Sequence, residues 1–223
     1  MNTSALTRTY LGMAAIALSC ASLFTVLSDI AFLPVLGTYP LLPTTVIAAL
    51  SGYPLLNVIL RVGIRPTAER DFNLLDFAVL VGLGALLAVP PIAIDLIWGF
   101  PHDMNVPVPQ ALLFYPAIGF VAEVVFHLLP LAILVACLRR WVSPNWLLVP
   151  VIFVEPLFQM AFSAELDLQA FLVFGNVCLV SAVQIWLFRR FGFGAMIALR
   201  MVFYLFWHVL WGTVRLSLLF PNA

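Results

Sequence analysis

The chain has 223 residues, of which 64% are hydrophobic and only 9% are charged, and its formal net charge is zero. A mean hydropathy of +1.13 lies outside the range of soluble globular domains. The basic residues are all arginines and form no polybasic tract, so we expect no nucleic-acid partner. The composition predicts an integral membrane protein whose main partner is the lipid bilayer.

Apolar stretches long enough to cross about 30 Å of hydrocarbon as helices recur along the chain. Strands of a barrel would show a period of two instead, so we predict an all-α, polytopic transmembrane bundle. Seven helices are expected, near residues 10–35, 44–60, 74–99, 111–138, 145–162, 170–188 and 195–220. We treat 1–223 as one membrane domain, with three N-terminal helices in 10–100 and a four-helix core in 110–220.

Arginines mark alternate connections between these helices. They occur before the first helix and after the second, fourth and sixth, whereas the connections near 36–43, 100–110 and 163–169 contain none. The positive-inside rule then predicts a cytoplasmic N-terminus and an external C-terminus. We expect the protein to reside in a bacterial inner (plasma) membrane.

The three N-terminal helices contain few polar groups. Asp29 lies near the end of the first helix, and Asp76 and Asp95 lie near the ends of the third. At those depths a carboxylate can reach headgroups or water, so we give these three residues little weight as candidates for a functional site.

The fourth helix contains the stretch "FVAEVVFHLLP", in which Glu123 and His127 interrupt an apolar run. A rise of about 1.5 Å per residue, counted from the arginines at the inner end, places both near the bilayer centre. Their four-residue spacing puts them on one helical face. Ionisable groups at this depth are costly, so each is a candidate for a functional site.

Polar residues of the last three helices fall in the same layer, namely Glu155, Asn176 and His208. On the seventh helix Arg200, Tyr204, His208 and Gly212 follow one another at four-residue steps. One face of that helix is therefore polar, and it must line a cavity or meet polar partners, because hydrocarbon cannot satisfy it.

Structural roles are the alternatives for these polar groups. Asn176, Gln184 and Gln159 suit hydrogen bonds that hold helices together. Arg200 and Arg215 can extend toward the two membrane interfaces. Glu123, His127, Glu155 and His208 can also form a purely structural ion-pair cluster.

Two short motifs carry a family resemblance. "AEVVFH" ends at His127, and "HVLWG" runs from His208 to Gly212. They resemble the EExxxR and HxxxN/D motifs of the CPBP intramembrane proteases (CAAX protease and bacteriocin-processing, or abortive-infection, family). Glu123 falls at the second Glu of the first motif, with Ala122 at the first Glu and His127 at the Arg. His208 is retained in the last motif, whereas Gly212 stands where the family has Asn or Asp.

The middle motif of the family, FxxxH, is matched poorly. Phe153 in "FVEPLFQ" would place Leu157 at the histidine position, and Glu155 lies close by in a different frame. The resemblance covers roughly residues 110–215, about half of the chain.

The resemblance implies an intramembrane endopeptidase, similar to the type II CAAX prenyl proteases. Its substrate would be a hydrophobic or lipidated peptide, such as a prenylated one. Glu123 would be the general base, His127 or His208 would donate to the oxyanion, and Glu155 would belong to the catalytic set. Asn176, Arg200 and Tyr204 would support the substrate. The departures at Ala122 and Gly212 leave a second hypothesis open, a catalytically inactive CPBP-like scaffold or immunity protein.

Two cofactor hypotheses also stay open. Glu123, His127, Glu155 and His208 offer two imidazoles and two carboxylates, a ligand set that zinc accepts, although the HExxH signature is absent. His127 and His208 lie at similar depth on separate helices and could serve as axial ligands of a haem.

Overall fold

A computed structural model describes residues 3–28, 40–67, 72–161, 163 and 165–220. Within these ranges the chain is helical and contains no strand, which confirms the expected all-α class. The helices are α1 (Thr3–Leu27), α3 (Leu41–Arg61), α4 (Leu74–Trp98), η1 (His102–Met104), α5 (Ala111–Glu123), η2 (Val124–Leu128), α6 (Leu129–Leu138), α7 (Leu148–Val151), α8 (Val154–Ala161), α9 (Leu168–Phe191), α10 (Phe193–Tyr204), η3 (Leu205–Trp211) and α11 (Gly212–Leu219). The end of the first expected span, residues 29–35, lies outside the described residues.

Six helical segments in the described part of the chain are long and apolar enough to cross a membrane. Two of them are composite: α5, η2 and α6 form one rod over Ala111–Leu138, and α10, η3 and α11 form another over Phe193–Leu219. The protein is therefore an integral membrane protein by length and composition of its helices.

The fifth expected span, 145–162, is not a continuous helix of spanning length, so the count of seven is not confirmed. It consists of two short helices, α7 and α8, which are separated by a break at Ile152 and Phe153. Pro156 explains the break, because it has no N–H to donate to Ile152 and its ring clashes with that carbonyl. Together they form an apolar helical segment, Leu148–Ala161, in which α8 packs against α9 and α7 against α6.

Local signals define the ends of the long helices. Asn73 caps α4 by accepting the Asp76 N–H at 2.9 Å, and Asp76 accepts the Asn73 N–H at 3.0 Å, which completes a capping box. The helix ends at Gly99, whose φ of 70° suits glycine. Asp167 caps α9, and Gly192 ends it with a φ of 95°.

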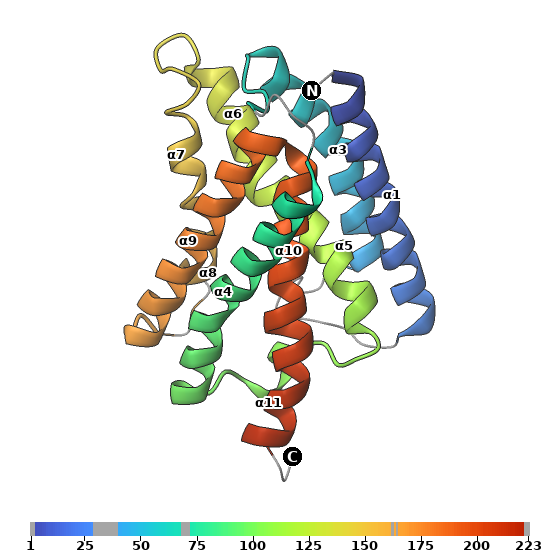
Figure 1. Ribbon diagram of the computed structural model, residues 1–223, viewed down its shortest axis with the longest axis vertical. Coiled ribbons are helices and arrows are strands. Elements are labelled where there is room, and N and C mark those ends of the chain that lie inside the picture. Colours follow the sequence, from blue (N-terminus) through green and yellow to red (C-terminus); the bar gives the residue numbers. More distant parts are fainter. Residues whose placement is uncertain (1–2, 29–39, 68–71, 162, 164, 221–223) are drawn as a thin grey trace.

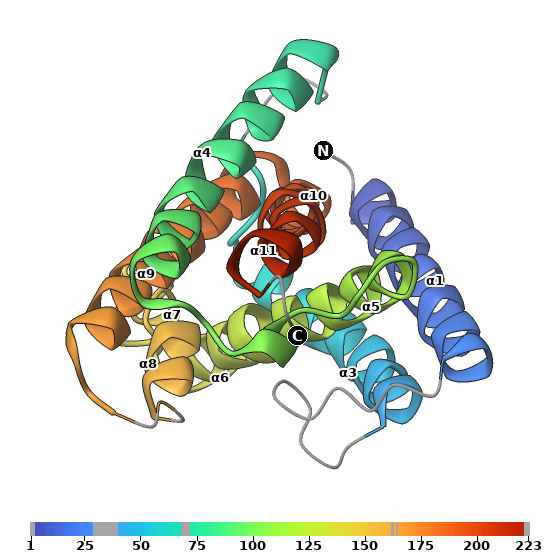
Figure 2. The ribbon, with the colours of Figure 1, turned by 90° about the horizontal axis from the view of Figure 1, so that it is seen from below.

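Helix α10 occupies the centre of the bundle, with α4 and α9 on one side and α1 and α5 on the other (Figure 2). Its residues contribute to both apolar clusters of the protein, one formed with α1, α3, α5 and α6 and the other with α4 and α9. The first turn of α1 and the last turn of α11 lie at opposite ends of the bundle (Figure 1).

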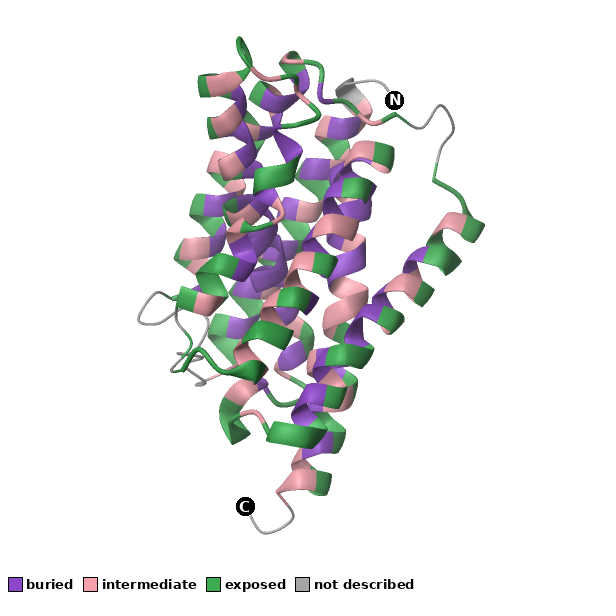
Figure 3. Cartoon of the chain, turned by 90° about the vertical axis from the view of Figure 1, so that its left-hand side faces the viewer, coloured by how far each residue is buried: buried purple, intermediate pink, exposed green. Residues whose placement is uncertain are grey.

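Two glycines let α10 approach its neighbours closely. A Cβ at Gly84 of α4 would lie 2.5 Å from Val202, and one at Gly119 of α5 would collide with Met201. Buried residues gather on the inward faces of the helices, and large apolar side chains such as Ile47 and Leu86 are exposed on the outside (Figure 3). This distribution suits a protein surrounded by lipid and places α10 where polar side chains must find protein partners.

Candidate functional site

Arg200 of α10 lies at the centre of a buried ionic cluster. Its Nε donates to Glu123 Oε1 at 2.5 Å, and its two terminal nitrogens donate to the Glu155 oxygens at 2.9 and 2.6 Å. The residue is only 2% exposed, so the structural alternative, in which Arg200 extends to a membrane interface, does not hold. One guanidinium instead joins carboxylates from α5 and α8, and it binds Glu155 in the bidentate geometry that arginine favours.

Two neutral side chains complete the hydrogen bonds of Arg200. The Tyr204 hydroxyl accepts from Arg200 at 3.0 Å, as the four-residue spacing on this helix predicts. Gln184 of α9 donates to Glu123 Oε1 and accepts from Arg200 at 3.4 Å. The prediction that Gln184 links helices by hydrogen bonds is therefore confirmed. We call Glu123, His127, Glu155, Gln184, Arg200 and Tyr204 the Arg200 cluster.

His127 joins this cluster through Glu123. Its Nδ1 lies 2.9 Å from Glu123 Oε2, which confirms that the two side chains share a face. Apart from this contact, Glu123 Oε2 and the two ring nitrogens have no hydrogen-bond partner among the described residues. Since His127 is 1% exposed, polar atoms here are buried without full compensation.

His208 lies in a second group of side chains, which we call the His208 cluster, formed with Asn105 and Tyr115. His208 Nδ1 is 2.6 Å from Asn105 Oδ1, and the ring stacks on Tyr115 with centroids 4.6 Å apart. The edge of Tyr204, 4.9 Å away between centroids, links the two clusters. The expected layer of four catalytic residues is thus divided, with three in the Arg200 cluster and His208 outside it.

Both histidines lie in π-helical turns. Glu123 is the last residue of α5, His127 falls within η2, and His208 falls within η3. Short π segments inside α-helices occur frequently at functional sites. The distortions therefore mark the same two places that the polar residues mark.

Asn176 and Gln159, which we expected to hold helices together, do not join either cluster by a hydrogen bond. Asn176 is buried on α9, and its Oδ1 has no hydrogen-bond partner within the described ranges. Gln159 of α8 is exposed. The supporting role predicted for Asn176 is not apparent in these contacts, whereas Arg200 and Tyr204 lie at the centre of the site.

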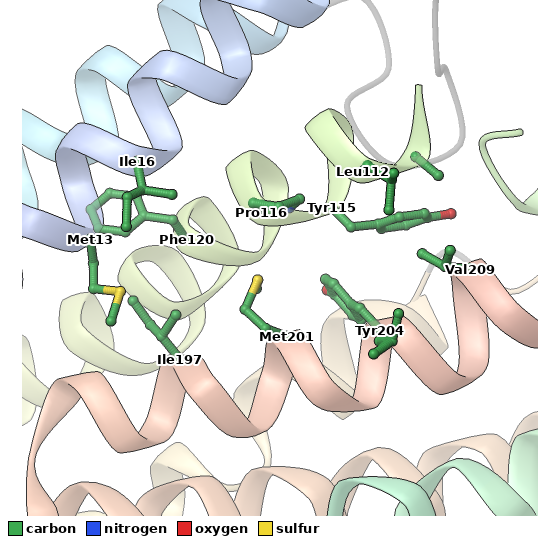
Figure 4. Close-up of a pocket in the computed structure, with 12 residues that line it drawn as sticks. Met13, Ile16, Leu112, Tyr115, Pro116, Phe120, Ile197, Met201, Tyr204 and Val209 are labelled. Carbon is green, nitrogen blue, oxygen red and sulfur yellow. The ribbon is translucent and has the colours of Figure 1, made fainter. Parts of the chain in front are cut away.

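An apolar cavity of about 370 Å³ adjoins both clusters (Figure 4). It lies between α1, α5 and the rod formed by α10 and η3, and it opens beside the exposed side chains of Ile16, Leu112 and Leu205. Tyr115 and Tyr204 both line it and lie near each other in Figure 4. A hydrophobic molecule in this cavity would lie against one residue of each cluster.

The donor set does not fit a zinc site. Among the described residues no three His, Cys, Asp or Glu side chains are placed to hold a metal ion. Arg200 occupies the positive centre between Glu123 and Glu155, where a cation would have to lie. Neither His127 nor His208 lines the cavity, so the cavity does not place them as a pair of haem ligands either.

A further buried ion pair lies toward the C-terminal end of the bundle. Arg215 donates to the two oxygens of Asp95 at 2.7 and 2.9 Å and to the carbonyls of Phe100 and Pro101 at 2.6 and 3.1 Å. Trp211 also donates to Asp95, at 2.7 Å. Both charged residues are at most 1% exposed, so the predictions that Asp95 reaches water and that Arg215 extends to the interface are wrong.

A scan against protein-family models and searches of curated proteins and of solved structures found no match to this chain.

Proposed function

We propose that this protein is an intramembrane peptidase of the CPBP type that hydrolyses an amide bond of a membrane-associated or prenylated peptide, with Glu123 as general base. The observation that carries the proposal is the buried pair of Glu123 Oε2 and His127, which have no hydrogen-bond partner in the described part of the chain apart from each other. Buried polar atoms of this kind need a partner, and a water molecule or a substrate group would supply it.

The hydrogen bonds on the other oxygen of Glu123 would orient it for this role. Arg200 and Gln184 both donate to Oε1, which leaves Oε2 directed toward His127. In the proposed reaction a water oxygen attacks the carbonyl carbon, and Oε2 takes the water proton and returns it to the leaving amine as the C–N bond breaks. His127 is the donor nearest to these atoms and would stabilise the oxyanion.

The apolar cavity would receive the hydrophobic part of the substrate. Its lining is almost entirely apolar, and the exposed residues at its edge face the side of the bundle that lipid surrounds. A prenylated or otherwise hydrophobic peptide could enter there from the bilayer. Tyr204 then connects the cavity to the Arg200 cluster.

The second candidate, a catalytically inactive CPBP-like scaffold or immunity protein, is favoured by the arrangement of Arg200. The same guanidinium holds Glu123 and Glu155, as in a structural ion-pair cluster. Ala122 and Gly212 at the motif positions agree with this candidate.

The proposed orientation has a cytoplasmic N-terminus and an external C-terminus in a bacterial plasma membrane. It is supported by the alternation of arginine-containing and arginine-free connections. With α7 and α8 taken as one further, shorter passage along α9, the two ends of the chain fall on opposite sides, as this orientation requires.

The test is cleavage of a panel of farnesylated and other lipidated peptides by the full chain in lipid nanodiscs. We expect wild type to cleave at least one peptide and Glu123→Gln to lower the rate by about 10²-fold or more. Glu165→Gln, which changes an exposed glutamate, is the matched control and should retain the wild-type rate. Equally poor cleavage by wild type and Glu123→Gln would contradict the peptidase and favour the scaffold.

A further inference from the structure

His208 is held by a residue that the motif comparison did not include. Its Nδ1 lies 2.6 Å from the side-chain oxygen of Asn105, which belongs to the connection between α4 and α5. Because an amide oxygen only accepts, Nδ1 carries the proton in this arrangement, and Nε2 of the neutral ring is then a free acceptor. Stacking on Tyr115 fixes the plane of the ring as well.

The carboxamide of Asn105 lies directly against Gly212. A Cβ placed on Gly212 would be 3.0, 3.1 and 3.2 Å from Nδ2, Cγ and Cβ of Asn105. These distances are tighter than ordinary van der Waals contact, so a side chain at position 212 would require Asn105 to move back by a few tenths of an ångström. The amide group of Asn105 thus occupies the space that a side chain on Gly212 would take, and Gly212 is the residue at which the HxxxN/D motif has its Asn or Asp.

The backbone on both sides of Asn105 is tied to the bundle. Arg215 donates to the carbonyls of Phe100 and Pro101, and the N–H of Val106 donates to the Tyr115 hydroxyl at 3.1 Å. Tyr115 is also the ring on which His208 stacks. The segment that holds Asn105 beside His208 is therefore fixed on both sides of Asn105. Asn105 itself is buried, with 8% of its surface exposed.

We propose that Asn105 is the positioning residue for His208, and that it supplies from the α4–α5 connection the amide that would otherwise come from position 212. Gly212 makes this possible because it leaves the space empty. The role of Asn105 in turnover rests on the proposed peptidase function, whereas its effect on the His208 ring does not. Asn105 acts through His208 and is not itself assigned a contact with substrate.

The state of the His208 ring can be measured directly by nitrogen NMR of the full chain, labelled with ¹⁵N-histidine and reconstituted in micelles. His102→Gln and His127→Gln assign the three histidine signals. Wild type should show His208 with its proton on Nδ1. Asn105→Ala should lose this state, and Asn105→Asp, which keeps an acceptor oxygen at the same place, should retain it.

Moving the amide from position 105 to position 212 gives a second, independent test of the proposal. Gly212→Ala should push the Asn105 amide away and lower the population of the Nδ1–H state of His208, although it changes no polar group. The double variant Asn105→Ala/Gly212→Asn should recover that state, because the amide then comes from position 212. A wild-type His208 protonated on Nε2, an unchanged ring in Asn105→Ala, or no recovery in the double variant would each overturn the proposal.

Parallel peptide cleavage separates this inference from the proposed function. A wild-type chain that cleaves no peptide but follows the NMR pattern would refute the peptidase and support the assignment of Asn105. A chain that cleaves peptides but keeps the Nδ1–H state in Asn105→Ala would support the peptidase and refute the assignment of Asn105.

Discussion

Two buried arginines, Arg200 and Arg215, bind carboxylates inside the bundle, but the charge around them is balanced differently. Arg215 faces the single carboxylate of Asp95 and bonds to both of its oxygens. Arg200 faces Glu123 and Glu155 together, and within the described residues Glu123 Oε2 is approached by His127 alone. The first arrangement is a closed structural pair, and the second contains one negative charge more than the arginine neutralises.

His127 lies where that extra charge is located. Its Nδ1 is 2.9 Å from Glu123 Oε2, so a protonated ring would balance the cluster and a neutral ring would leave it negative. Among the described residues, no histidine is hydrogen-bonded to Asp95 or Arg215. A buried group with unmatched charge and unpaired polar atoms is costly, and we interpret its presence here as a sign of function.

Removal of each arginine gives the largest expected effect. Arg215→Met leaves one buried carboxylate unpaired and should lower the free energy of unfolding by about 3–5 kcal/mol. Arg200→Met leaves two and should cost more, so that little folded protein accumulates. Unfolding of both variants in detergent micelles measures the difference. Equal losses would mean that charge balance does not distinguish the two clusters.

Replacing a whole ion pair by apolar side chains should separate the clusters further. Asp95→Leu/Arg215→Met removes both charges, so most of the stability lost in Arg215→Met should return. The matched variant Glu155→Leu/Arg200→Met should stay unstable, because Glu123 remains buried without its guanidinium. The same unfolding measurement compares them, and recovery in the second pair would contradict the interpretation.

The smallest effect on stability is expected at His127. Nε2 has no hydrogen-bond partner in the described part of the chain and Nδ1 makes a single contact, with Glu123 Oε2, so His127→Leu should lower the free energy of unfolding by about 0.5–1.5 kcal/mol. His208→Leu leaves Asn105 Oδ1 unpaired and should cost about 1–3 kcal/mol. Under the proposed function His127→Leu nevertheless abolishes peptide cleavage. A large loss of stability in His127→Leu would assign that histidine a structural role.

The fold was predictable where local signals define it. The third span was expected at 74–99 and is found at Leu74–Trp98, because the Asn73 cap and Gly99 flank an apolar run. The fifth span was not, because its apolar composition concealed the effect of Pro156 on the helix. Composition measures how well a segment suits lipid, whereas the backbone hydrogen bonds decide whether it forms one helix.

The candidate site was predictable only within single helices. The pair of Glu123 and His127 follows from four-residue spacing, as does the bond between Arg200 and Tyr204. Between helices, the common depth of Glu123 and Glu155 predicted that they lie together, and Arg200 joins them. The pairing of Asn105 with His208 was missed, because the two are 103 residues apart and the sequence carries no direct record of helix register. Charges within or near the ends of spans were the one available signal, and Asp95 and Arg215 were set aside because depth alone cannot tell a buried ion pair from a side chain that reaches the interface.

The two π turns bear on how this chain should be aligned with others. A π turn closes its hydrogen bond one residue later than an α turn, so each of η2 and η3 holds one residue more than a regular helix of the same course. Glu123 and His127 still meet across the first of these turns, because four residues remain close to one full turn of a wider helix. The extra residue instead rotates everything beyond the turn relative to a regular helix. A homologue with regular helices at these points would match this chain over both halves of each rod only with a one-residue gap at the turn.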